Sequence, residues 1–250
     1  MEELLQFEAV NRRFGGVLAV DGVSLAVAPG ELTALIGPNG AGKTTLFNLA
    51  AGALPPTAGQ VRFLGRPVTG AAAVCRQGLA RTFQNIRLFS GMTVLENLLV
   101  GMGGHGFRAG SLPWPACRRA ETRRRRQAWF LLERFGLGDY AERPAAGLPF
   151  GVQRVVEIAR ALAAGPKLLL LDEPAAGLNR TETRQLELLL RQIHADGVTL
   201  LLVEHDMALV MSLARRVVVL DCGRVIADGA PAVVRRDPRV RTAYLGGEAQ

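Results

Sequence analysis

The feature that most constrains this chain is a glycine-rich run over residues 37–44, which consists of Gly37, Pro38, Asn39, Gly40, Ala41, Gly42, Lys43 and Thr44. It matches the pattern G-x-x-x-x-G-K-[ST], whose backbone N–H groups cradle phosphates while the lysine reaches the β- and γ-phosphates. Glycine allows the backbone to approach a ligand closely, and the following helix adds its positive N-terminal end. We therefore predict that this loop, together with Thr45, binds a nucleoside triphosphate, and that the Thr44 hydroxyl binds Mg²⁺.

The sequence on either side of the loop supports this prediction. Residues 31–36 favour a strand and residues 45–50 favour a helix, which is the context that the pattern requires. A chance glycine-rich turn, the alternative interpretation, would need neither neighbour.

A second motif joins an apolar strand to two acidic residues. Leu168–Leu171 is a run of four leucines, and Asp172 and Glu173 follow it directly. Such a run is typical of a strand buried on both faces of a parallel sheet, and ligands bind at the carboxyl ends of such strands. We predict that Asp172 holds the shell of Mg²⁺ through water and that Glu173 polarises the attacking water. The alternative is a buried strand that happens to end in a surface turn.

Composition restricts the class of protein further. The chain has 250 residues, of which 49% are apolar and 21% are charged, so it can bury a large core. No stretch predicts a transmembrane helix, and the acidic start at Met1 is not that of a signal peptide. The three cysteines are scattered, which suits a reducing cytosol and argues against a disulfide framework or a metal site.

The net charge of +8 is concentrated in one region, where Arg118, Arg119 and Arg123–Arg126 precede an amphipathic stretch that predicts a helix over 118–135. A solvated helix face, a contact with lipid headgroups or a membrane partner, and nucleic-acid binding are the three interpretations of these arginines. No basic sheet interleaved with aromatic residues supports the third, so we expect no nucleic-acid partner.

The order of the predicted elements indicates an α/β fold. Strand patterns near the N-terminus predict an antiparallel β-subdomain, and from residue 167 onward strands alternate with helices, which indicates parallel βαβ units. Residues 93–100, 118–135 and 152–163 predict helices, with a loop rich in glycine and proline over 101–115. The region after Gln84 thus predicts a helical lobe inserted into a split α/β core.

Three shorter motifs complete an ordered series. Residues 81–84 (Arg-Thr-Phe-Gln) end a predicted strand, residues 148–154 (Leu-Pro-Phe-Gly-Val-Gln-Arg) open a predicted helix, and residues 200–206 form a predicted strand that ends in Glu-His-Asp. In this order, with the two phosphate motifs, they resemble the Q-loop, signature motif, Walker B motif and H-switch of ATP-binding cassette (ABC) ATPases.

This resemblance implies a P-loop NTPase fold of the ABC type. The chain would be a single ATP-binding domain over residues 1–250, whose core consists of residues 1–84 and 163–250. That core would include the antiparallel β-subdomain and a C-terminal extension, and residues 85–162 would form the inserted helical lobe that carries the signature motif.

The resemblance also implies roles for residues outside the P-loop. Gln84 would reach the metal, beside Thr44 and Asp172, or the attacking water. His205 would contact the γ-phosphate, and together with Glu173 these two residues form the expected catalytic group. Phe14 would stack on adenine, with plain core packing as its alternative.

The signature motif departs from the family's usual Leu-Ser-Gly-Gly-Gln. Pro149 replaces the serine, Phe150 replaces the first glycine and Val152 replaces the glutamine. In this family the signature motif of one subunit covers ATP bound to the other, and the serine hydroxyl is one of the ligands. The hydroxyl contact is therefore absent here, while the N–H of Gly151 and the helix N-terminus remain available to the nucleotide. The sequence gives no reason for Val152.

Further segments resemble one subfamily, the ATP-binding subunits of importers for branched-chain amino acids. They are residues 13–16, 88–89, 92–97, 172–179, 204–207 and 243–246. The resemblance implies an ATPase that uses ATP and Mg²⁺, a second cassette of a different kind, two transmembrane permease subunits and, indirectly, a solute-binding protein. It places the chain peripherally on the cytoplasmic face of the inner (plasma) membrane. The alternatives are an importer of urea or another small polar solute, and a non-transport ABC ATPase that acts on nucleic acid or ribosomes.

Overall fold

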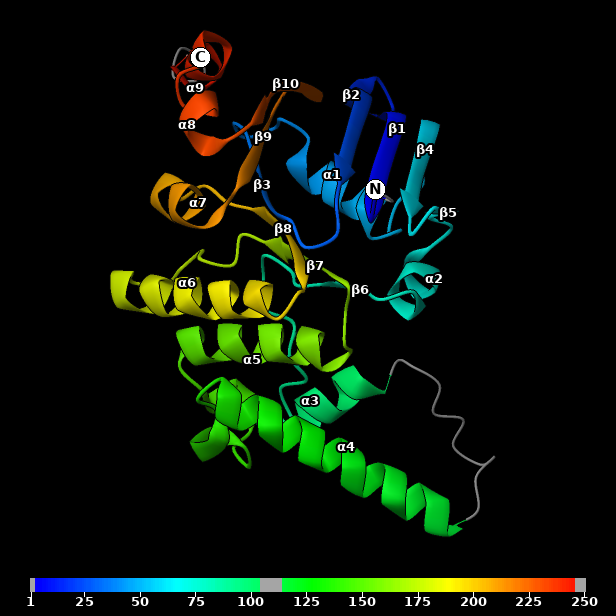
Figure 1. Cartoon of the computed structure of the whole chain (residues 1–250), viewed down its shortest axis with the longest axis vertical. Coiled ribbons are helices and arrows are strands. Elements are labelled where there is room, and N and C mark those ends of the chain that lie inside the picture. The colour runs from blue at the N-terminus through cyan, green and yellow to red at the C-terminus, as the bar shows by residue number, and fades with distance from the viewer. Residues whose placement is uncertain (1–2, 104–113, 246–250) are drawn as a thin grey trace.

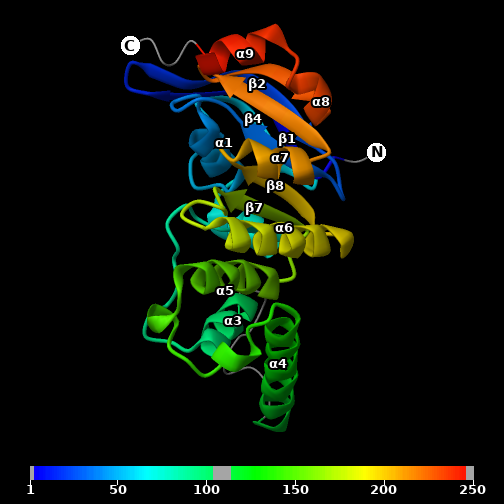
Figure 2. The same ribbon diagram turned by 90° about the vertical axis from the view of Figure 1, so that its left-hand side faces the viewer.

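The computed structural model describes residues 3–103 and 114–245 of the chain. Two sheets enclose helix α1, further helices cover the outer side of the larger sheet, and a helical lobe lies beyond them (Figures 1 and 2). The strands are β1 (Leu5–Phe14), β2 (Val17–Val27), β3 (Leu32–Ile36), β4 (Ala58–Phe63), β5 (Arg66–Pro67), β6 (Leu79–Arg81), β7 (Leu168–Asp172), β8 (Thr199–Val203), β9 (Arg216–Asp221) and β10 (Arg224–Gly229). The helices are α1 (Lys43–Ala50), α2 (Ala71–Arg76), α3 (Val94–Met102), α4 (Trp114–Arg134), α5 (Phe150–Ala163), α6 (Arg180–Ala195), α7 (Met207–Leu213), α8 (Pro231–Val234) and α9 (Pro238–Leu245).

The smaller sheet is antiparallel and has the strand order β2-β1-β4-β5. The alternation of the sequence predicts strands over residues 4–10 and 23–28. The hairpin formed by the first two strands is longer, because β1 continues to Phe14 and β2 begins at Val17. The register of this pair shifts between Phe7 and Val10 and again near Arg12. Each shift interrupts the alternation of inward and outward side chains, so the outer half of the hairpin does not read as a strand in the sequence.

The larger sheet has the strand order β10-β9-β3-β8-β7-β6, and its strands from β9 to β6 are parallel. Every residue of β3, β7 and β8 is buried, which explains their unbroken apolar sequences. This sheet and its helices confirm the predicted α/β fold class.

The predicted alternation of strands and helices ended with the strand over 217–221, and one edge of this sheet carries a further strand, β10, which forms an antiparallel hairpin with β9. The turn consists of Cys222 and Gly223, and both residues have positive φ, at 44° and 78°. Two positive φ values are required by the commonest two-residue hairpin turn. Asparagine or aspartate usually occupies the first of these positions. Because a cysteine lies there in this chain, the sequence does not show the usual signal for a hairpin turn.

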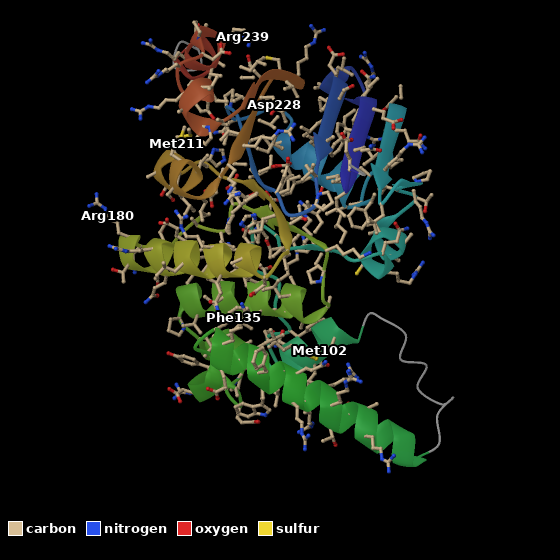
Figure 3. All side chains as sticks on the ribbon, viewed as in Figure 1. Met102, Phe135, Arg180, Met211, Asp228 and Arg239 are labelled. Atoms are coloured by element: carbon tan, nitrogen blue, oxygen red, sulfur yellow. The ribbon has the colours of Figure 1, made fainter. Side chains whose placement is uncertain are left out.

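The helical lobe is built from α3, α4 and α5 around its own apolar cluster. Phe135 packs against both this cluster and the cluster beneath the larger sheet, where the lobe meets the core (Figure 3). Helix α5 begins at Phe150, two residues earlier than predicted, with Pro149 at its N-cap. The predicted loop was wrong at its ends, since α3 runs to Met102 and α4 begins at Trp114; its residues 104–113 lie outside the described ranges.

The structure also bears on two expectations from the sequence, which are the absence of a transmembrane helix and the position of the arginine-rich region. Over residues 3–103 and 114–245, no helix combines the length and apolar character needed to cross a bilayer. In the arginine-rich region of α4, Arg119, Arg123, Arg125 and Arg126 are exposed. The role of these arginines stays a prediction, as do the domain boundaries at residues 84 and 163.

Candidate active site

Parallel strands deliver the predicted site residues to one edge of the larger sheet. Leu35 of β3 and Asp172 of β7 both lie in register with Val203 of β8. The segments that follow these strands carry the P-loop, Glu173 and His205, so all of them emerge at the same edge. Open α/β sheets bind their ligands at this edge.

The P-loop is shaped by two glycines that fit tightly against neighbouring strands. A Cβ atom on Gly37 would lie 2.1 Å from the carbonyl oxygen of Leu220, and one on Gly42 would lie 2.3 Å from that of Ala19. Gly42 also has a φ of 101°, a conformation that L-residues with side chains rarely adopt. No other residue type therefore fits at either position.

Lys43 folds back onto the loop that it follows. Its buried Nζ donates hydrogen bonds to the carbonyl oxygens of Gly37 at 2.7 Å and Pro38 at 2.9 Å. Burial lowers the pKa of this ammonium group, while the charges of Glu173 and Asp172 oppose that shift. The ammonium group is thus held against the loop by two carbonyl oxygens, and phosphate oxygens could replace them as acceptors.

Gln84, Glu173 and His205, the three residues expected to form the catalytic group, are joined by hydrogen bonds, whereas their catalytic roles stay a prediction. Gln84 Nε2 donates to Glu173 Oε2 at 2.9 Å, and His205 Nε2 lies 2.8 Å from Glu173 Oε1. Glu173 itself has a φ of 47°, which is uncommon for a residue with a side chain and typical of strained functional sites. Because each carboxylate oxygen has a second lone pair, Glu173 can still accept a hydrogen bond from water.

The chemistry of the predicted metal ligands suits Mg²⁺, which prefers oxygen donors and retains several waters. Thr44 lies exposed in the first turn of α1, and Asp172 lies at the end of β7. No three His, Cys, Asp or Glu side chains within the described ranges are grouped as a dedicated metal cage. A site shared between two protein oxygens and phosphate oxygens, as predicted, is consistent with both observations.

Sequence reasoning missed a buried ion pair that fixes the segment carrying Gln84. Arg154 and Glu157 of α5 are 0% and 1% exposed and are joined at 2.8 Å. Arg154 donates to the carbonyl oxygens of Phe83 at 2.9 Å and Gln84 at 2.8 Å, while Glu157 accepts from the N–H of Arg87 at 3.1 Å. The available signal was two opposite charges three positions apart on an otherwise apolar helix face.

Glu204, beside His205, was also missed. Its buried carboxylate accepts hydrogen bonds from the N–H groups of Ala175 at 2.7 Å and His205 at 3.0 Å. Burial raises the pKa of this carboxyl group, although those same N–H groups oppose the shift. Glu204 therefore ties the loop after the Asp172-Glu173 pair to the histidine segment.

Comparison with known proteins identifies the family of this chain. The family model described as ABC transporter matches residues 20–176. The chain belongs to the ABC transporter family. A second model, described as branched-chain amino acid ATP-binding cassette transporter, matches residues 224–250.

Relatives of this cassette resemble it over nearly its full length. It is 45% identical over 249 residues to the high-affinity branched-chain amino acid transport ATP-binding protein BraF of Pseudomonas aeruginosa, covering 97% of this chain and 98% of that protein. It is 44% identical over 251 residues to the corresponding LivG protein of Escherichia coli K12, covering 98% of each. An ATP-binding cassette of an ABC transporter, solved in its ADP conformation, superposes with a TM-score of 0.85 at 34% identity, covering 98% of this chain and 100% of that one. Cassettes of this family are ATPases that power transport, and this chain is therefore an ATPase.

The signature motif of the cassette packs against α6 and the helical lobe. Gly151 is buried against α6, where a Cβ atom would lie 2.6 Å from Glu182 Oε1. The side chain of Val152 packs against the apolar cluster of the lobe. This packing gives the physical reason for an aliphatic residue at that position, which the sequence alone did not provide.

Phe14 lies at the end of β1, and 43% of its surface is exposed. The guanidinium of Arg12 lies 4.7 Å from the centre of the ring. The exposed ring argues against core packing, and the hairpin that carries it contains Ala19, the residue that abuts Gly42 of the P-loop. A role in stacking on the base stays a prediction.

We expect Phe14→Ala to weaken the binding of ATP and GTP together, because stacking barely distinguishes the bases. The loss of about 1–3 kcal/mol typical of such stacking corresponds to about fivefold or more in the dissociation constant. Val17→Ala is the matched control, since Val17 faces Phe14 across the hairpin and is 68% exposed. Fluorescence titration with both nucleotides is the measurement, and a loss of less than twofold would contradict the prediction.

Proposed function

We propose that this cassette is the ATP-hydrolysing subunit of an importer for branched-chain amino acids. The observation that carries the proposal is the full-length similarity to proteins named for this transport, together with the match of residues 224–250 to the branched-chain model. The absence of a spanning helix from the described ranges fits a subunit that is held peripherally at the cytoplasmic face of the membrane by permease subunits.

The site residues have distinct tasks in this proposal. Lys43 exchanges the carbonyl oxygens of Gly37 and Pro38 for the β- and γ-phosphates. Glu173 orients the attacking water and accepts its proton, while Gln84 and His205 hold the Glu173 carboxylate from either side. Bound Mg²⁺ would neutralise charge on the phosphates, with Thr44 and, through water, Asp172 as its contacts.

We also infer that the working assembly contains a second, different cassette. The signature motif of this chain lacks the serine hydroxyl that usually contacts the γ-phosphate, because Pro149 occupies that position. In a homodimer, both nucleotides would face this weakened motif. In a heterodimer, the P-loop of this chain would face the signature motif of the partner cassette.

The proposed transport function is tested by reconstitution with the permeases from neighbouring genes. In proteoliposomes, we expect ATP hydrolysis to rise when a solute-binding protein loaded with leucine, isoleucine or valine is present, and not when urea is offered. Stimulation by urea or another polar solute would move the cassette to a related importer. Association with ribosomes or nucleic acid, without co-purification of permeases, would contradict a transport function.

The isolated cassette is expected to remain mostly monomeric with ATP and to hydrolyse it slowly. The physical reason is the incomplete signature motif, which leaves each nucleotide with fewer contacts across a homodimer. Light scattering on the Glu173→Gln variant with ATP is the measurement, because slowed hydrolysis would preserve any ATP-bound dimer. A stable homodimer, together with transport restored by this cassette alone, would contradict the heterodimer.

A further inference from the structure

Arg81 is a charged side chain at the active site to which neither motif nor mechanism gives a task. It lies at the end of β6, and its side chain is only 9% exposed. Nη2 donates to Asp172 Oδ2 at 2.7 Å, and Nη1 donates to Asn48 Oδ1 at 2.5 Å. The guanidinium also lies 5.9 Å from the ring centre of Phe47 and 5.1 Å from that of Phe83. Its position is therefore fixed from several directions.

The two hydrogen-bond partners of Arg81 belong to the two elements that carry the metal contacts. Asn48 lies on α1, four residues after Thr44 and so on the same face of that helix. Asp172 ends β7. Within the described residues, α1 and β7 are thus connected by one planar guanidinium whose two nitrogens point to fixed acceptors.

We propose that Arg81 is a positioning residue for the Mg²⁺ site of this ATPase. It sets the spacing between Thr44 and Asp172 by bridging α1 and β7, and it orients the Asp172 carboxylate through one oxygen. This inference rests on the proposed function, since it assigns a task to a residue behind the predicted metal contacts.

The contacts of Asp172 indicate that Arg81 orients this carboxylate and does not compete with the metal for it. Arg81 engages Oδ2 alone, and Oδ1 accepts no hydrogen bond from the side chains that the structure describes. One oxygen therefore remains for a metal-bound water while the other holds the carboxylate in place. Groups that orient a direct metal ligand typically contribute about 10–100-fold to metal affinity. Because Asp172 is expected to contact the metal through water, we expect Arg81 to contribute at the lower end of that range.

The test measures how Mg²⁺ changes nucleotide affinity rather than activity. A fluorescent ATP analogue is titrated into the full-length protein, first in EDTA and then over a range of MgCl₂ concentrations. For Arg81→Met we expect the Mg²⁺ concentration that gives half of the affinity gain to rise about tenfold. Affinity in EDTA should stay within twofold of the wild type, because the P-loop is untouched. Arg81→Lys should recover part of the loss, since it restores the charge but not the two-armed bridge.

Asn48→Ala is the second variant, because removing Arg81 leaves the Asp172 carboxylate buried without a partner and could unfold the protein. It keeps the ion pair and removes only the link to α1, so we expect a rise of severalfold in the same Mg²⁺ concentration. Arg62→Met is the matched control, since it breaks an ion pair with Glu8 whose two side chains are 36% and 52% exposed.

Several results would overturn the proposal for Arg81. An unchanged Mg²⁺ requirement in Arg81→Met and Asn48→Ala would overturn the proposal, and so would equal losses with and without metal. A lower requirement in Arg81→Met would also overturn it, by showing that the arginine competes with the cation for Asp172. If the wild-type protein gained no ATP affinity from Mg²⁺, the inference would be overturned, whereas the proposed function would fail only if Mg²⁺-dependent phosphate release were also absent.

Discussion

Glu173→Gln is expected to leave ATP binding intact and to lower hydrolysis by about 10²–10⁴-fold, the range typical of a lost general base. The amide has nearly the same shape as the carboxylate but accepts a proton far less readily. It can still accept one hydrogen bond from Gln84 or His205 and should keep the local fold. Phosphate release under steady state, together with retention of radiolabelled ATP, measures both effects.

Glu187→Gln is the control for this substitution. Glu187 lies on α6, where its carboxylate accepts from Arg191 at 2.8 Å, and the arginine lowers the pKa of that carboxyl group. Among the residues that the structure describes, no hydrogen bond or ion pair connects it to the group at Glu173, so hydrolysis should be unchanged. If Glu173→Gln also hydrolysed ATP within a few-fold of the wild type, Glu173 would lose the role of base.

Lys43→Ala should weaken ATP binding by about 10–100-fold, because a hydrogen bond to a charged group contributes about 1.5–3 kcal/mol. The folded state should change little. The substitution removes two hydrogen bonds to loop carbonyls, but it also removes the cost of burying a charge. Calorimetry gives the ATP affinity, and thermal unfolding without nucleotide gives the effect on the fold.

The chain offers a matched control for this prediction in Lys167, its other lysine. Lys167 is exposed and precedes β7, at the end of that strand opposite Asp172. Lys167→Ala should therefore leave ATP affinity unchanged. Unchanged affinity in Lys43→Ala would mean that the glycine-rich loop does not bind the triphosphate.

The parts of the site that could be predicted from the sequence are those formed by one continuous segment of the chain. The P-loop needs a fixed spacing of glycines and lysine between a strand and a helix, and Glu173 follows directly from a leucine strand. Local sequence determines both. The convergence of Gln84, Glu173 and His205 was predicted only through the family resemblance, because no rule of spacing brings residues from three loops together.

The supporting network could not be predicted for the same physical reason. Arg81 and Asp172 are separated by 91 residues, and Arg154 lies 70 residues from the Gln84 carbonyl that it binds. Such contacts depend on the order of strands in the sheet and on the docking of α5, which periodicity does not determine. Val152 illustrates the converse, since its packing in the lobe explains a residue that the motif pattern made look anomalous.

The buried pair Arg154 and Glu157 joins helix α5 to the segment that carries Gln84. A buried ion pair adds little net stability compared with apolar residues of similar volume, but it permits only one arrangement of the groups that it joins. We therefore expect a displacement of Gln84 to be passed to α5, whose first turn contains Gly151. We therefore expect this ion pair to contribute more to the coupled movement of the two segments than to the free energy of unfolding.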